Sequence, residues 1–189
     1  MVLLFFCVSG VLGEIRRHPS VTTRDEGPDA IRPLEADARL LAQTIEPFAG
    51  TVVVIGNDWP FIYDLDFLKQ ACVPLGRTVV GSVMALGGGT KESAVLTYME
   101  MRPDPFIIVA SPDFEFTEST AARRVDVNPK TGFDDESADR VRILLRECGS
   151  AATEAPSNDD VLRARVGVDL LQFKRRVAAV RPGANGQEP

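Results

Sequence analysis

The sequence is poor in the residues from which disulfide-bonded and zinc-bound folds are built. It holds three cysteines, Cys7, Cys72 and Cys148, and a single histidine, His18. The cysteine count is odd and no pair has the C-x-x-C spacing, which argues against a disulfide framework and a zinc knuckle. Unpaired thiols fit a reducing compartment best, so we expect a cytoplasmic protein.

Positive charge is also scarce. The 21 Lys and Arg residues are outnumbered by 27 Asp and Glu residues, and the formal net charge is −6. An acidic chain repels polyanions, so nucleic acid and anionic membrane surfaces are not expected as main partners. The apolar run that opens the chain has about twelve residues, which is too short to cross a bilayer. We therefore expect no membrane span.

Apolar residues, by contrast, are abundant: 44% of the 189 residues are hydrophobic and 25% are charged. This composition is typical of one globular domain with a sizeable core. We divide the chain into an N-terminal apolar segment and linker at 1–28, a single α/β domain at 29–180, and a tail at 181–189 that we expect to be disordered.

The opening residues, MVLLFFCVSGVLG, allow three interpretations. An apolar run that ends in small residues resembles the core of a secretory signal, although the basic stretch before it is missing. The same run has the composition of a buried strand, since it is rich in Val, Leu and Phe. The third interpretation is an artefact of an upstream start site. A cleaved signal would make the protein secreted instead of cytoplasmic.

Predicted strands and helices alternate from residue 29 onward. Strands are indicated by the runs TVVVIGN, RTVVGSVMAL and PFIIVAS, and helical periodicity is present at 29–45, 64–71, 90–99 and 134–145. Such alternation predicts a parallel sheet covered on both faces. We therefore expect an α/β fold, a three-layer α/β/α sandwich with a mainly parallel central sheet. The three runs between 51 and 110 are expected to be neighbouring strands.

The C-terminal part gives a weaker pattern. Residues 112–133 predict irregular structure, and the segment GSAATEAPSNDD predicts a loop. From residue 161 onward the apolar positions fit one long helix, yet 163–168 also alternate as a strand would. The helix is the favoured interpretation, and the strand stays open as the alternative.

Acidic side chains cluster after the predicted strands. An open parallel sheet binds ligands beyond the carboxyl ends of its strands, so the segments that follow the three runs should meet at one edge. The carboxylates that these segments bring are Asp58, Asp64, Asp66, Asp113 and Glu115. Carboxylates that converge repel one another unless a cation relieves them. The pattern therefore predicts either a site for a hard divalent metal ion or a solvated acidic rim.

Three motifs, in this order, resemble the hydrogenase-maturation endopeptidases and the related sporulation protease. They are TVVVIGNDWPFIYDLD, VVGSVMALGGGT and PFIIVASPD, and the resemblance covers residues 51–148. It implies a three-layer α/β/α fold and a metal-dependent peptidase that acts on a client protein. It places the acidic metal ligand at Asp64, with Asp66 close by and Asp113 after the third strand.

Two departures from the family pattern bear on activity. The aspartate expected directly after the third strand is Ala110 here, and the family's histidine ligand has no counterpart, because His18 lies before the first motif. A zinc or nickel type of site needs more than one well-placed carboxylate. The resemblance therefore implies a metallopeptidase homologue that is either active or catalytically degenerate.

A glycine-rich turn offers an alternative function. Gly87, Gly88 and Gly89 precede a predicted helix that Thr90 caps. Backbone N–H groups at such a turn can bind an anion, and Lys91 would add positive charge, giving a non-enzymatic module for an anion, a nucleotide or a protein. The turn also resembles the phosphate-binding turn of the tubulin group, although no glycine follows Thr90. The remaining interpretation is a turn that serves only the path of the chain.

Overall fold

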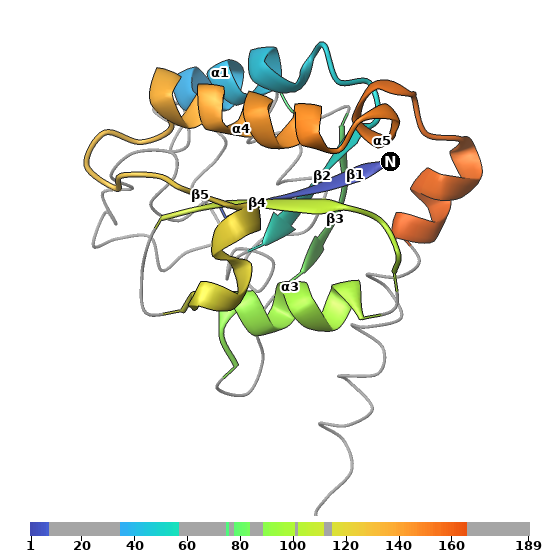
Figure 1. Cartoon of the computed structure of the whole chain (residues 1–189), viewed down its shortest axis with the longest axis horizontal. Coiled ribbons are helices and arrows are strands. Elements are labelled where there is room, and N and C mark those ends of the chain that lie inside the picture. The colour runs from blue at the N-terminus through green and yellow to red at the C-terminus, as the bar shows by residue number, and fades with distance from the viewer. Residues whose placement is uncertain are drawn as a thin grey trace, which may run out of the picture.

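The structure is a computed structural model, and it describes residues 1–7, 35–56, 75, 78–83, 89–100, 102–111 and 115–165. These residues form a sheet of five strands with helices on both faces, which confirms the expected α/β sandwich (Figure 1). The strands are β1 (Val2–Phe6), β2 (Thr51–Gly56), β3 (Val79–Val83), β4 (Phe106–Ala110) and β5 (Arg124–Asp126). The helices are α1 (Glu35–Ile45), α3 (Lys91–Met99), the 3-10 helix η4 (Glu118–Arg123), α4 (Asp135–Glu147) and α5 (Ser150–Thr153).

The first strand in the sequence lies in the middle of the sheet. The strand order is β3-β2-β1-β4-β5, and every neighbouring pair is parallel. Phe5 of β1 is in register with Val54 on one side and with Ile108 on the other. Residues 2–6 of the opening apolar run therefore form a buried strand. The expectation that the strands between 51 and 110 are all neighbours is wrong, because β1 separates β2 from β4.

The two faces of β1 pack into two different hydrophobic cores. Leu4 and Phe6 contact the core under α1 and α4, whereas Leu3 and Phe5 contact the core over α3. Figure 1 shows α1 and α4 on one side of the sheet and α3 on the other. A strand that is covered on both faces has no solvent side, so its sequence shows no alternation of polar and apolar residues.

The starts of α3 and α4 are fixed by capping side chains. The Thr90 hydroxyl accepts a hydrogen bond from the Ser93 N–H (3.0 Å), and the Asp134 carboxylate accepts one from the Ser137 N–H (3.0 Å). Hydrogen bonds from Ser137 lower the pKa of Asp134 below its usual value. Each cap satisfies a backbone donor that the helix leaves without a partner. The predicted helix starts at these two positions are confirmed.

The segment that was expected to be irregular contains an edge strand. Residues 124–126 form β5, and η4 comes just before it. Val125 and Val127 are buried while Asp126 is exposed, so the alternation is present but spans too few residues to stand out. Part of the expected loop after α4 is also helical, as α5. Residues 158–165 are helical as favoured, and residues 8–34, 57–74 and 166–189 lie outside the described part of the chain.

A buried hydroxyl at the start of β2 provides a test of the packing. Thr51 is 3% exposed, and its Oγ1 has no hydrogen-bond partner among the described residues. We expect Thr51→Val to raise the free energy of unfolding by about 1 kcal/mol, because an unsatisfied polar atom is replaced by a methyl group of similar size. Chemical denaturation followed by circular dichroism measures this change.

The matched control is Thr44→Val in α1. The Thr44 hydroxyl is also buried, but it donates a hydrogen bond to the Leu40 carbonyl at 2.7 Å. We expect this variant to lose about 1 kcal/mol, since a hydrogen bond that is made disappears. If both substitutions lowered the free energy of unfolding by the same amount, the Thr51 hydroxyl would have a hydrogen-bond partner in solution.

Candidate functional site

The carboxyl ends of all five strands meet at one edge of the sheet, because the strands are parallel. The chain runs from β1 to β2 and β3 on one side, and then crosses to β4 and β5 on the other. The strand order therefore reverses between β1 and β4. Open α/β sheets bind ligands beyond such a reversal point, where the two following loops diverge. The candidate site lies beyond Phe6 of β1 and Ala110 of β4.

Several predicted site residues follow strands whose positions are known. Those that lie outside the described residues are Asp58, Asp64, Asp66, Asp113, Gly87 and Gly88. The strands before the aspartates are β2, which ends at Gly56, and β4, which ends at Ala110. Only β1 lies between these two strands, so they are about 10 Å apart. Within the described part of the chain, no group of three or more His, Cys, Asp or Glu side chains is placed to hold a metal ion.

The remaining residues of the predicted anion loop begin α3. Gly89 is exposed, Thr90 caps the helix, and Lys91 is 8% exposed. The Lys91 N–H donates to Oε2 of Glu115 at 2.9 Å, and the Lys91 ammonium lies 3.0 Å from Oε1 of the same carboxylate. A carboxylate of the chain itself thus occupies a position where the first turn of a helix favours an anion. Glu115, expected on the acidic rim, is the partner of Lys91.

Next to this ion pair, Glu92 ties α3 to the segment before η4. Glu92 is 5% exposed, and its carboxylate accepts hydrogen bonds from the Thr117 N–H (3.1 Å), the Ser119 hydroxyl (3.1 Å) and the Thr120 hydroxyl (2.7 Å). Burial raises the pKa of Glu92, but the hydrogen bonds from Thr120, Thr117 and Ser119 outweigh burial and lower the pKa below its ordinary value. The carboxylate is therefore ionised at neutral pH.

Arg124 fastens the other side of the same segment. Its guanidinium donates to the Thr117 carbonyl (2.8 Å) and to the Thr120 hydroxyl (3.1 Å), pairs with Asp126 and lies 5.4 Å from the centre of the Phe116 ring. We call the set formed by Glu92, Thr117, Ser119, Thr120 and Arg124 the Glu92 cluster. It holds the segment that leaves β4 against α3, and so fixes one wall of the carboxyl edge.

The sequence gives little indication of the Glu92 cluster. A glutamate in the first turn of a helix is common on surfaces, where it interacts favourably with the helix dipole. Its partners lie 25 to 28 residues further along the chain, in a segment without clear periodicity. The only available signal is the density of hydroxyl side chains in TEST at 117–120.

No family model, curated protein or solved structure matches this chain. Among the described helices, none combines the length and the apolar character that crossing a bilayer requires.

Proposed function

We propose that this chain is a hydrogenase-maturation-peptidase-like α/β protein that holds a divalent metal ion at the carboxyl edge of its sheet. The strand order carries the proposal. Asp64 and Asp66 follow β2 in the sequence, and Asp113 follows β4. These two strands flank β1, so the segments that bear the aspartates begin on either side of its end. A ligand at the reversal point between β1 and β4 is within reach of both segments.

The charges at this edge favour a cation. Lys91 is the basic residue that directly follows the glycine-rich turn, and its ammonium group is paired with Glu115 at 3.0 Å. Glu115 therefore offsets part of its positive charge, while Asp64, Asp66 and Asp113 add three carboxylates in the segments that follow β2 and β4. Carboxylate oxygens suit hard ions such as Mg²⁺ and Mn²⁺, which accept several oxygen ligands.

The set of residues supports metal binding better than peptide hydrolysis. In a metallopeptidase the metal activates a water molecule or polarises the carbonyl of the scissile bond. Here Ala110 stands where the family has an aspartate, and the sole histidine, His18, precedes the family motifs. We therefore favour the catalytically degenerate form, a metal-dependent protein whose partner is a client protein.

The proposal predicts that purified protein binds Mn²⁺ and that Asp64→Ala weakens this binding. Loss of a direct ligand should lower the affinity by about 100-fold or more, since even residues that only orient a ligand contribute 10- to 100-fold. Isothermal titration calorimetry and metal analysis after dialysis measure the effect. The control is Asp159→Ala, which removes an exposed carboxylate from the helix at 158–165. Equal Mn²⁺ binding by Asp64→Ala and the wild type would overturn the proposal.

The alternative, an anion-binding module built on Gly87, Gly88, Gly89, Thr90 and Lys91, makes a different prediction. Phosphate would raise the melting temperature in a saturable manner, and Lys91→Ala would abolish the rise. The Glu115 carboxylate disfavours this outcome, because it already accepts the Lys91 N–H and pairs with the Lys91 ammonium. Phosphate stabilisation without Mn²⁺ binding would make the anion-binding module the better description.

A further inference from the structure

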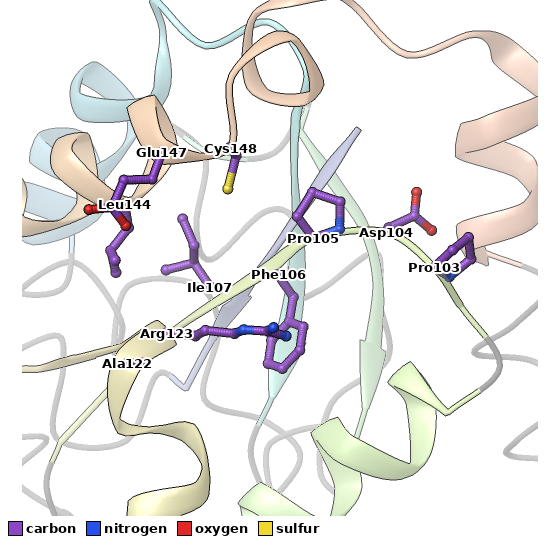
Figure 2. A pocket seen from close by; sticks show the side chains of 10 residues that line it. All are labelled: Pro103, Asp104, Pro105, Phe106, Ile107, Ala122, Arg123, Leu144, Glu147 and Cys148. Carbon is purple, nitrogen blue, oxygen red and sulfur yellow. The ribbon is translucent and has the colours of Figure 1, made fainter.

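A hollow opens at the opposite, amino edge of the sheet, beside the start of β4. Its volume is about 380 Å³. Consecutive residues, 103–107, form one wall of the hollow, and residues of η4 and of the carboxyl end of α4 complete it (Figure 2). A wall of consecutive residues indicates that the hollow follows the edge of a strand. All the lining residues belong to the described part of the chain, and none takes part in the metal site proposed above.

The hollow exists because β5 is shorter than β4. β5 pairs with residues 108–110, so it stops short of Phe106 and Ile107. The helix that leads into β5, η4, lies on the α3 side of the sheet and does not continue the line of β5 (Figure 1). Within the described residues, no strand pairs with the first part of β4 on that side.

The backbone of β4 can form a strand pair on this open side. The Pro105 carbonyl accepts a hydrogen bond from the Leu3 N–H at 3.0 Å, so residue 105 faces β1. The Ala110 carbonyl accepts one from the Val127 N–H at 2.8 Å, so residue 110 faces away from β1. Alternate residues of a strand face the same neighbour, so the N–H and C=O groups of Phe106 also point away from β1. Proline at 105 therefore removes no donor from the open edge.

The side chains that line the hollow are divided between the two faces of the sheet. Phe106 belongs to the core over α3, whereas Ile107 belongs to the core under α1 and α4. Figure 2 shows Arg123 beside Phe106 on one side of the β4 ribbon, and Leu144 and Glu147 on the other side. An added strand has the same division, because its successive side chains point to opposite faces of the sheet. The hollow therefore fits an extended peptide.

Each face of the hollow favours a different kind of side chain. On the α3 face, Arg123 lies with its Cζ 4.9 Å from the centre of the Phe106 ring and forms no ion pair with any described residue. Stacking fixes the plane of the guanidinium and leaves its N–H edge able to bind a carboxylate. On the α4 face, Ile107 and Leu144 are apolar, and the exposed Glu147 would repel a carboxylate. This division favours a peptide in which acidic and apolar residues alternate.

We propose that the hollow binds an extended peptide segment of a partner protein, which adds to the sheet as a strand beside residues 103–107. Its main chain pairs with the backbone of Phe106, an acidic side chain binds Arg123, and the neighbouring apolar side chains cover Ile107 and Leu144. Main-chain pairing supplies the affinity of such added strands, and the side-chain contacts supply the specificity. The site is independent of the metal proposed at the carboxyl edge, so failure of one proposal leaves the other in place.

Fluorescence anisotropy of the full chain with a labelled LELEL peptide tests the two faces. We expect saturable binding, and binding about tenfold or more weaker for LQLQL, which lacks the charge, and for LLLEE, which lacks the alternation. Arg123→Gln should weaken the binding of LELEL to the level of LQLQL. The matched control is Arg146→Gln, because Arg146 is exposed near the end of α4 and does not line the hollow.

Methylation of the peptide nitrogens tests the main-chain pairing. Only every second N–H of an added strand faces β4, so methyl groups on the leucine nitrogens and on the glutamate nitrogens of LELEL should have different effects. We expect one of the two methylated peptides to lose binding and the other to bind within about threefold of LELEL. Equal affinities of the two methylated peptides would overturn the proposal.

Three further results would also overturn the proposal. One is the absence of an anisotropy change up to about 1 mM protein, a concentration that reveals even weak peptide binding. Another is binding of LLLEE as tight as that of LELEL, which would mean that no strand is formed. The third is a dimer in sedimentation velocity that LELEL does not dissociate, which would assign the open edge of β4 to a second copy of this chain.

Discussion

The Gly50→Ala variant is expected to lose about 3 kcal/mol or more of its free energy of unfolding. Gly50 lies just before β2, where the chain passes against α5. A Cβ atom at this position would lie 2.2 Å from the Ala151 carbonyl oxygen and 2.7 Å from that of Glu154. Both are backbone atoms, so no side-chain rotation relieves the overlap. Either the start of β2 or the whole of α5 has to move.

Such a movement breaks contacts on two sides. The Gly50 N–H donates to the Ala152 carbonyl at 2.8 Å, and the Gly50 carbonyl accepts from the Val2 N–H at 2.9 Å. Gly50 therefore joins α5 to the beginning of the central strand. Displacing it breaks these two hydrogen bonds and leaves their buried backbone groups without partners. Denaturant unfolding followed by circular dichroism measures the loss.

Gly56→Ala, at the other end of β2, is the matched control. Its Cβ would lie 3.3 Å from the Cys7 sulfur and 3.8 Å from a methyl group of Val83, both of which are side-chain atoms. We expect a loss of about 1 kcal/mol, because these atoms can shift by a few tenths of an ångström. The close approach of α5 to Gly50 is refuted if Gly50→Ala is as stable as Gly56→Ala.

The Glu92→Gln variant is expected to lose about 2 kcal/mol of unfolding free energy at pH 7. Glutamine has nearly the size of glutamate, but its amide nitrogen cannot accept a hydrogen bond. One oxygen then has to serve the Thr117 N–H and the hydroxyls of Ser119 and Thr120, which the two carboxylate oxygens now share. Hydrogen bonds to a charged acceptor are also stronger than those to a neutral one.

The pH dependence of this loss separates charge from packing. The folded-state pKa of Glu92 lies below its ordinary value of 4.5, so its charge stabilises the fold fully above pH 4.5. This stabilisation disappears as the pH falls through the folded-state pKa. The difference in stability between the wild type and Glu92→Gln should therefore shrink on acidification. The pKa of Asp134 is also lowered, but its contribution cancels because both proteins contain it.

Urea unfolding of both proteins between neutral and acidic pH measures this difference. Glu136→Gln is the control, since Glu136 is exposed in the first turn of α4 and accepts no hydrogen bond among the described contacts. We expect it to be within about 0.5 kcal/mol of the wild type. A stability difference for Glu92→Gln that stays constant with pH would mean that the loss comes from packing alone.

Local features of this fold could be predicted from the sequence, whereas contacts between distant segments could not. The caps at Thr90 and Asp134 involve residues three positions apart, so the signal lies within one short stretch. The buried runs at β2 and β4 are equally local. The place of β1 in the sheet depends on pairing with residues about 50 and 100 positions away, since Val2 pairs with Thr51 and Leu3 pairs with Phe106.

The candidate site likewise has one part that could be predicted from the sequence and one part that could not. The convergence of the segments after β2 and β4 follows from a parallel sheet, which the sequence predicts. The Lys91 N–H donates to Glu115 and not to a bound anion. This contact depends on how the chain turns after β4, and such a turn leaves no periodic pattern in the sequence. The assignment of Asp64, Asp66 and Asp113 to a metal remains a prediction.

The central place of β1 also governs the order in which the sheet can be completed during synthesis. β1 emerges from the ribosome first, but its second partner, β4, lies about 100 residues further along, which takes roughly 5–20 s to translate. Until then one edge of a fully apolar strand has no neighbour, and such an edge pairs readily with other chains. Contacts of this sequence separation also slow folding. The nascent chain should therefore depend on chaperones until β4 has been made.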